Sequence, residues 1–329
     1  DCQASEVIFT ATGTEANNLA IKGLYWKGIK ENKKVIITST FEHHAVMDPI
    51  VWLTEHEGAQ VVGISVDRKG FIDLAELEEV IEKYHDEISF ISIMHSNNEV
   101  GTLQDIAQVV KMARDIPVHS DCVQSFGKVD LSFKKLGLTA ATISAHKIGG
   151  PLGVAALILK KGLDIEPILH GGGQERDIRS GTFNAPSIVS FAAAAKESVA
   201  QSNQRSEIIR KLKAELISTI KKGVPDIWVN GDQEKSLPGI ISITFPKTDS
   251  EGLLLLLDSE GIACSTGSAC SAGVQRPSHV LLAMGLTEDE TTSTLRFSLN
   301  HSNTIVEIAK LGAVIASVVA RSRAASGKK

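Results

Sequence analysis

The sequence is poor in aromatic residues and cysteines, and it contains no long apolar run. Aromatic residues make up 5% of the chain and apolar residues 43%, so we expect an aliphatic core of buried strands and covering helices. No run of about 18 uninterrupted apolar residues indicates a membrane span. The four cysteines lack paired spacing, which favours a reducing compartment over a disulfide framework and predicts a cytoplasmic protein.

An excess of positive charge is absent too. The net charge of −5 argues against a broad nucleic-acid surface. The chain has no initiator Met and no signal-like region, and an apolar segment begins by residue 7, so we interpret its start as a cut inside a domain. For that reason the lack of a targeting segment carries no weight for the location of the protein.

Strand-like and helix-like segments alternate over the first 160 residues. Asp73 is a predicted helix N-cap, with Glu76 completing a pattern like a capping box. The alternation predicts an α/β fold with a mainly parallel sheet, whose ligands lie beyond the carboxyl ends of the strands. Strands are predicted at 7–10, 35–38, 61–66, 88–95, 118–122, 140–144 and 154–159, and helices at 15–26, 74–84 and 105–114.

A second region follows a long predicted helix over residues 187–222. Its pattern is that of a smaller α+β domain, so we predict domains at 1–200 and 201–329. The small, basic tail at 321–329 is predicted to be disordered. Strands are predicted at 228–230, 240–244 and 294–299, and helices at 252–257, 278–284 and 305–319.

Lys147 is the most informative residue, because other polar groups accompany it at predicted strand ends. The stretch Ser144-Ala145-His146-Lys147 ends one predicted strand, and Asp121 and Gln124 end another. A pyridine aldehyde cofactor requires an amine for a Schiff base, a carboxylate that keeps the ring nitrogen protonated, and small polar groups for a phosphate. A solvated turn is the alternative for the His-Lys pair taken alone.

Three further polar clusters follow predicted strands. Gly13 and Thr14 open a helix, where backbone N–H groups and a hydroxyl bind anions, although an ordinary turn has the same composition. His43, next to His44, could stack on an aromatic cofactor or shuttle protons. A solvated turn is the alternative, and a metal pair lacks a carboxylate at suitable spacing. Asn98 could donate to a phenolic oxygen of a cofactor or make a turn.

Two stretches contain arginines suited to acidic groups. The Gly-rich stretch 170–182 contains Arg176, Arg179 and Thr182, which suit a phosphate, even across a subunit boundary. A flexible linker is the alternative there. Arg296 lies on a short predicted strand, where a structural ion pair is the default and a bidentate clamp on an amino-acid carboxylate is the functional use.

Residues 263–273 are almost all small and include Cys264 and Cys270. We predict that this segment is mobile, so a thiol on it could enter a pocket, react and carry its product away. A disulfide between the two cysteines and half of a metal site are the alternatives. Both rank lower, because the spacing is not CxxC.

Together these segments resemble the cysteine desulfurases, which are pyridoxal-phosphate enzymes of aminotransferase class V. The segment around Cys270 is similar to that of the NifS and IscS types, which supply sulfur to iron–sulfur assembly. The resemblance implies the aspartate aminotransferase-like fold type I for the large domain, and a homodimer. Eight segments match the family's signatures in the family's order: residues 13–18, 42–46, 97–101, 121–125, 144–147, 179–182, 265–271 and 295–298.

The resemblance also implies a role for each matching residue. Lys147 would hold pyridoxal 5'-phosphate and act in catalysis. Cys270 would hold the sulfur taken from L-cysteine as a persulfide, for delivery to a scaffold or sulfur-carrier protein. No metal site made of protein alone is implied, although Cys270 could contact a nascent iron–sulfur cluster. The other implied contacts are Asp121 at the ring nitrogen, His43 on the ring, Gln124 and Asn98 near the phenolic oxygen, Gly13, Thr14, Ser144, His146 and a partner chain's Thr182 at the phosphate, and Arg296 with Asn98 at the substrate.

Two alternatives stand beside this hypothesis. A selenocysteine lyase, or another class V lyase or aminotransferase, would carry the same cofactor groups. A truncated chain could instead be an interaction domain that binds no cofactor, since the family's opening segment of several dozen residues is missing. Cys122 replaces a usual Ala and residues 12–15 depart from the commoner forms, but the reacting groups are all present.

Overall fold

The computed structural model describes residues 1–267 and 277–327, which divide into two compact units. The domain boundary predicted at residue 200 stays a prediction, because close packing does not show which part folds by itself. The first unit comprises Asp1–Ser65, Ile72–Ser96 and Gln104–Ser202, and the second comprises Val66–Phe71, Asn97–Leu103 and Asn203–Lys329.

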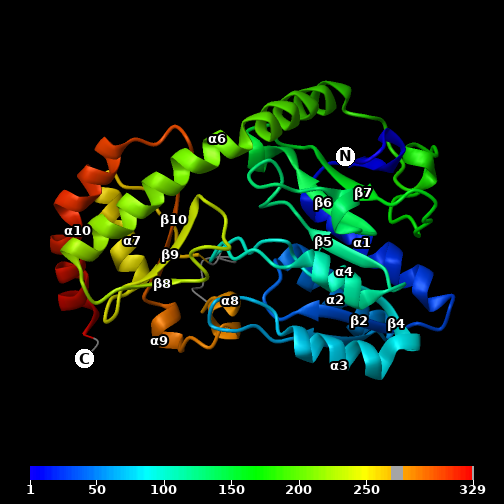
Figure 1. The fold of residues 1–329 in the computed structure, drawn as a ribbon, viewed down its shortest axis with the longest axis horizontal. Coiled ribbons are helices and arrows are strands. Elements are labelled where there is room, and N and C mark those ends of the chain that lie inside the picture. Colours follow the sequence, from blue (N-terminus) through cyan, green and yellow to red (C-terminus); the bar gives the residue numbers. More distant parts are fainter. Residues whose placement is uncertain (268–276, 328–329) are drawn as a thin grey trace. The chain divides into compact units, whose positions relative to one another are not determined.

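A seven-stranded sheet forms the centre of the first unit, in the order β1-β7-β6-β5-β4-β2-β3 (Figure 1). The neighbours from β6 to β3 pair in parallel, whereas β7 is antiparallel to both β6 and β1. The predicted α/β fold with a mainly parallel sheet is therefore confirmed. The strands are β1 (Val7–Thr10), β2 (Val35–Ser39), β3 (Gln60–Ile64), β4 (Ile88–Ser92), β5 (Val118–Asp121), β6 (Ala140–Ser144) and β7 (Ala155–Leu159).

The inner strands are buried along their whole length. Every residue of β2, β4, β5, β6 and β7 is buried, as expected for strands covered on both faces. The helices of this unit are α1 (Gly13–Ile29), α2 (His44–Glu57), α3 (Leu74–Tyr84), α4 (Ile106–Ala113), α5 (Phe133–Leu136) and the first part of α6 (Ala185–Gly223).

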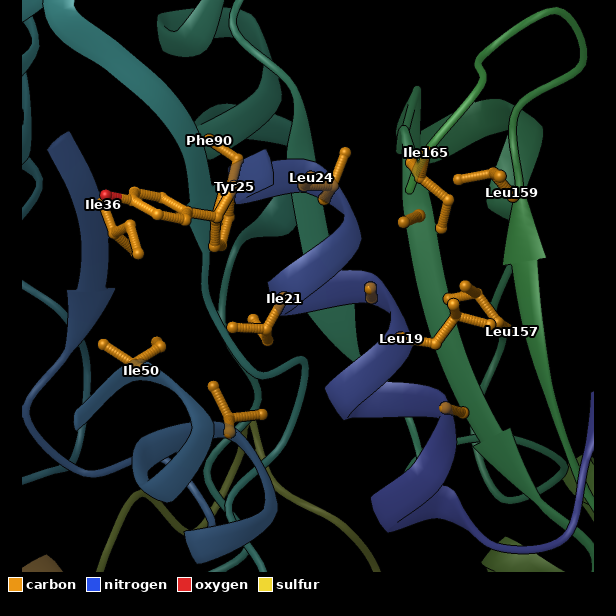
Figure 2. Close-up of a cluster of buried hydrophobic side chains, with 14 of the residues drawn as sticks. Leu19, Ile21, Leu24, Tyr25, Ile36, Ile50, Phe90, Leu157, Leu159 and Ile165 are labelled. Carbon is orange, nitrogen blue, oxygen red and sulfur yellow. The ribbon is translucent and has the colours of Figure 1, made fainter. Parts of the chain in front are cut away.

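Helix α1 packs along the sheet and supplies much of the first core. Leu19 and Tyr25 are fully buried. Figure 2 shows Leu19 directed toward Leu157 of β7, while Tyr25 lies on the side of Ile36 and Phe90. An aliphatic surface of this size holds α1 firmly, because each buried side chain contributes about 1.5–3 kcal/mol on leaving water.

Helix α2 was not predicted from the sequence. Pro49 lies inside it, and Pro usually ends a helical pattern because it lacks the backbone N–H. The helix forms nonetheless, with His43 as its N-cap and Gly58, at φ +70°, as its C-cap. Burial of Val46, Ile50 and other apolar side chains outweighs the local cost of Pro49.

The predicted N-cap of α3 is confirmed, but its capping box is not. The side chain of Asp73 accepts from the backbone N–H groups of Ala75 and Glu76 at 2.9 and 3.1 Å. Glu76 does not return a bond to the N-cap backbone. Its Oε2 accepts instead from the backbone N–H of Ser65 at 2.8 Å, which joins the start of α3 to the end of β3.

The second unit contains the three-stranded antiparallel sheet β10-β9-β8 and its helices. Its core includes Leu253, Ile243, Leu295 and Ile315, which are fully buried. Among the described residues, no helix combines the length and apolar character needed for a membrane crossing. Its elements are β8 (Trp228–Asn230), β9 (Ile240–Thr244), α7 (Ser250–Ser259), α8 (His279–Ala283), α9 (Glu288–Thr291), β10 (Thr294–Ser298) and α10 (Ile305–Ser326).

The prediction of a disordered tail is wrong for residues 321–326. Helix α10 continues to Ser326. Arg323 donates to both carboxylate oxygens of Asp226, at 2.8 and 2.7 Å, and to the carbonyl oxygen of Pro246 at 3.0 Å. The hydroxyl of Ser326 also donates to the carbonyl oxygen of Lys247 at 2.7 Å. These contacts reach back about 75 to 100 residues, and composition alone does not reveal them.

Leu19→Ala should lower the free energy of unfolding by about 2–5 kcal/mol, because it leaves a cavity between α1 and the sheet. Urea denaturation at pH 7 measures the change. The control is Leu152→Ala, since Leu152 is 80% exposed and its loss should change stability by no more than about 0.5 kcal/mol. Equal losses in the two variants would contradict the position of Leu19 in the core.

Candidate active site

Lys147 lies on a short helical turn directly after β6. The turn, Ala145–Ile148, ends at Gly149, whose φ of +83° suits the left-handed conformation that closes it. The side chain of Lys147 is exposed. Strands β5 and β6 run parallel with Asp121 opposite Thr142, so the residues that end both strands meet at one edge of the sheet.

Asp121 is a buried carboxylate with both oxygens hydrogen-bonded. The Nδ2 group of Asn17 donates to Oδ2 at 2.7 Å, and the backbone N–H of Val123 donates to Oδ1 at 2.9 Å. Burial raises the pKa of Asp121, while these two bonds and the nearby His43 and Lys147 oppose that rise. The structure therefore places His43 and Lys147 near enough to Asp121 to act on its charge, while their roles in one site stay a prediction.

Asn17 is a site residue that the sequence analysis missed. It lies within the matched segment 13–18, yet no role was assigned to it. Its contact with Asp121 spans 104 residues, so only the fold reveals it. The available signal was the pair Asn17 and Asn18 shortly after Gly13, and the sequence alone does not indicate which asparagine is directed toward the sheet.

The N-terminus of α1 approaches the end of β6. A Cβ atom on Gly13 would lie 3.6 Å from Cβ of Ser144 and 3.2 Å from Cγ2 of Val123. The hydroxyl oxygen of Ser144 lies 2.9 Å from Nδ1 of His146. Thr14 follows Gly13 with an exposed side chain. Backbone N–H groups at a helix start, two hydroxyls and an imidazole form a donor set for an anion such as a phosphate.

His43 and Glu42 precede α2 beside this edge. Nδ1 of His43 accepts from the backbone N–H of Ala45 at 3.0 Å, so a neutral ring carries its proton on Nε2. Glu42 is fully buried, and its Oε1 accepts from the hydroxyl of Ser39 at 2.5 Å and the backbone N–H of Met94 at 2.8 Å. Glu42 thus joins the ends of β2 and β4 next to His43.

His119 is a structural histidine beneath the site. It is fully buried, with Nδ1 at 2.9 Å from the hydroxyl of Ser92 and Nε2 at 3.2 Å from the hydroxyl of Thr142. Burial lowers the pKa of His119 to about 3, so the ring is uncharged at neutral pH. It links β4, β5 and β6 below Asp121 without adding charge.

Arg296 and Asn98 contact each other in the second unit. Nη1 of Arg296 donates to the carbonyl oxygen of Asn98 at 3.0 Å. The backbone of Arg296 also pairs with that of Ser265 through two hydrogen bonds, at 3.0 and 2.6 Å. The resemblance predicts that both residues contact the substrate, and that assignment stays a prediction.

The Gly-rich stretch gives a mixed result. Arg179, offered for a phosphate, forms a two-pronged ion pair with Glu15 in the first turn of α1, at 2.6 and 3.3 Å. Thr182 is exposed, and its assignment to a partner chain's phosphate stays a prediction.

Cys270 lies outside the described residues, so its role also stays a prediction. Burial raises the pKa of Cys264 to about 11, which disfavours that thiol as the nucleophile.

An apolar cavity of about 550 Å³ lies on the other face of the same sheet. Ala141 and Ile143 of β6 line it, whereas Thr142 of the same strand contacts His119. Cys122 lines the cavity, while its neighbour Asp121 faces α1. Among the described residues, none of the predicted site residues lines this cavity, so it is separate from the candidate site.

The sequence pattern of aminotransferase class V matches residues 2–311. The chain belongs to this family. It is 43% identical to an IscS-like cysteine desulfurase of Mycobacterium tuberculosis, over 98% of this chain and 83% of that relative. Among solved structures it is similar to a NifS-like protein (TM-score 0.88, 34% identity, 97% of this chain and 84% of that one) and to SspA in complex with cysteine (TM-score 0.75, 33% identity, 92% and 83%).

The family uses pyridoxal phosphate, and the residues of the first unit fit that group. The donor set at Gly13, Ser144 and His146 suits a phosphate, the buried Asp121 suits a protonated ring nitrogen, and the amine of Lys147 is exposed between strand ends. The family prediction and the fold-class prediction are both confirmed.

Glu42→Gln should gain stability relative to the wild type as the pH rises. Burial raises the pKa of Glu42 from 4.5 to about 8, with a smaller contribution from Asp121. Between these values the folded state binds more protons than the unfolded chain, so the free energy of unfolding falls with rising pH. The amide of the variant does not titrate, so the difference should grow by up to about 1.4 kcal/mol per pH unit.

Urea denaturation at pH 5, 6, 7 and 8 measures this difference. The exposed Glu78→Gln is the matched control and should show no such growth. A constant difference between Glu42→Gln and the wild type over this range would contradict the raised pKa of Glu42.

Proposed function

We propose that this protein is a cysteine desulfurase that uses pyridoxal phosphate to convert L-cysteine to L-alanine, leaving the sulfur as a persulfide on Cys270. The observation that carries the proposal is the exposed amine of Lys147 near the buried Asp121, whose two carboxylate oxygens each accept a hydrogen bond. The family of the chain and its desulfurase relatives support the same assignment. A cytoplasmic homodimer is part of this proposal, with the partner's Thr182 completing the phosphate site.

Different residues would bind different parts of the cofactor. The start of α1 at Gly13 and Thr14, with Ser144 and His146, would hold the phosphate. His43 would stack on the ring, and Asp121 would hold the proton of the ring nitrogen. When bound, pyridoxal phosphate supplies an electron sink for the negative charge that develops at the α-carbon of the substrate. Gln124 and Asn98 would bind the phenolic oxygen.

Lys147 would act on the α-carbon. Its neutral Nζ would take the proton from that carbon and return a proton later, as a general base and then a general acid. Arg296, whose Nη1 already bonds the carbonyl of Asn98, would bind the substrate carboxylate through its remaining donors. The solved relative in complex with cysteine supports an amino-acid substrate of this kind.

Sulfur transfer would follow at Cys270. Its thiolate would attack the sulfur of the substrate, so that a sulfur–sulfur bond forms and the carbon–sulfur bond breaks. The electron pair of the broken bond stays with the carbon part, which leaves as alanine after protonation. The outer sulfur of the persulfide on Cys270 would then be transferred to an iron–sulfur scaffold or a sulfur-carrier protein.

Two substitutions test the two reacting groups. Cys270→Ala should keep the visible absorbance of the bound cofactor but abolish sulfide release from L-cysteine, since the acceptor thiol is lost. Lys147→Ala should lose covalent retention of the cofactor after borohydride reduction, because the amine that holds it is absent. Absorbance spectra and mass spectrometry of the purified proteins measure these results.

The products separate this proposal from the other readings. Alanine and sulfide are expected, while a keto acid would point to an aminotransferase and a marked preference for selenocysteine to a selenocysteine lyase. Retained sulfide release in Cys270→Ala would remove the persulfide step. If the wild-type protein shows no cofactor absorbance after incubation with pyridoxal phosphate, the assignment as a pyridoxal-phosphate enzyme is wrong.

Asn17→Ala should weaken binding of pyridoxal phosphate by about 10-fold, because the carboxylate of Asp121 loses one of its two donors. Titration of cofactor-free protein at pH 7 measures the dissociation constant. The adjacent asparagine gives a matched control, since Nδ2 of Asn18 donates to the carbonyl of Thr14 and, among the described residues, not to Asp121. Asn18→Ala should change binding less than about 2-fold. Equal effects of the two variants would show that Asn17 does not act through Asp121.

A further inference from the structure

The turn after β5 brings a second lysine, Lys128, to the site. The backbone N–H of Lys128 bonds to the carbonyl of Ser125 at 3.0 Å. Gly127, which precedes it, is buried at φ +70°, and its carbonyl accepts from the hydroxyl of Ser198 at 2.8 Å. A Cβ atom on Gly127 would lie 2.6 Å from Oγ of Ser198 and 3.1 Å from Cγ2 of Ile148. The turn is therefore held on two sides, and its conformation requires glycine.

This packing brings Lys128 close to Lys147. Gly127 immediately precedes Lys128, and Ile148, which it contacts, immediately follows Lys147. The charges of the two lysines act on each other, and both act on His146. Lys128 thus belongs to the same cluster as the predicted Schiff-base lysine, although the sequence analysis gave it no role.

Lys128 bonds the amide of Gln124. Its Nζ donates to Oε1 of Gln124 at 3.2 Å. Burial and the charge of Lys147 lower the pKa of Lys128 to about 8, so most of it is still protonated at pH 7. An ammonium group has donors only, so the amide must present its oxygen to Lys128. The NH2 group, with its two donors, is then the end left for a ligand.

We propose that Lys128 is a positioning residue that fixes the amide of Gln124 so that the site offers a donor, and not an acceptor, to an oxygen anion of the ligand. The proposal rests on the proposed function, in which that oxygen is the phenolic oxygen of pyridoxal phosphate. Without Lys128 the amide turns freely between two orientations, and one of them places its oxygen against the phenolic oxygen. Two acceptors in contact repel each other, so binding weakens.

The test compares two ligands that differ only in this oxygen. Cofactor-free protein at pH 7 is titrated with pyridoxal 5'-phosphate and with its analogue lacking the phenolic hydroxyl, 3-deoxypyridoxal 5'-phosphate. Lys128→Met should weaken binding of pyridoxal phosphate by about 10-fold and binding of the analogue by less than about 2-fold. Lys128→Arg keeps a charged donor and should restore most of the affinity.

A double-mutant cycle with Gln124 adds a readout that a purely structural role would not give. In a Gln124→Met background the amide is absent, so Lys128→Met should cause no further selective loss for pyridoxal phosphate. The control is Lys196→Met, because Lys196 is exposed on α6 and lines the opposite, apolar cavity. Melting curves confirm that each variant is folded, and Lys128→Leu replaces Lys128→Met should the latter be unfolded.

The outcomes separate this proposal from the proposed function. Equal weakening of both ligands by Lys128→Met, or the same selective loss in the Gln124→Met background, would overturn the role of Lys128 in orienting the amide. Unchanged binding of pyridoxal phosphate in Lys128→Met would also overturn it. Wild-type protein that binds neither ligand would instead overturn the cofactor assignment, on which this proposal depends.

Discussion

The site depends on one buried contact, the hydrogen bond from Asn17 of α1 to Asp121 of β5. A buried carboxylate is stable only where donors surround it, and a rigid helix supplies this one. The same helix begins at Gly13, against Ser144, and its next turns bury Leu19 in the core. From Gly13 to Asn17 the helix rises about 6 Å, so one rigid element sets both the anion-binding end and the carboxylate end of the site.

The charges around this contact are few, and burial controls them. Glu42 lies close enough to Asp121 for the two carboxylates to repel each other, yet its pKa of about 8 leaves it mostly neutral at pH 7. His119 is neutral as well, because burial lowers its pKa to about 3. Burial raises the pKa of Asp121, whereas the nearby His43 and Lys147 favour its charged form. This arrangement favours a ligand with a cationic ring and several anionic oxygens.

The sequence points to Lys147 and Asp121 as candidate reacting groups because each of them follows an apolar strand. Lys147 and Asp121 stand at strand ends, where a parallel sheet collects its ligands. The supporting groups escaped prediction, because a contact such as that of Asn17 joins distant segments. The same reason explains two errors in the fold. Helix α2 forms despite Pro49 because Val46, Ile50 and Leu53 on one of its faces are buried. The tail is helical because Arg323 bonds Asp226.

Alternation beyond the end of β5 explains why the thiol of Cys122 lies away from the candidate site. Cys122 directly follows Asp121, so it points to the opposite face, where it lines the apolar cavity. Burial there raises its pKa to about 12, and burial raises that of Cys264 to about 11. Both therefore stay protonated at neutral pH and are poor nucleophiles. A thiol adjacent to Asp121 in sequence thus does not compete for the substrate sulfur, and the proposed transfer relies on Cys270, far away in the sequence.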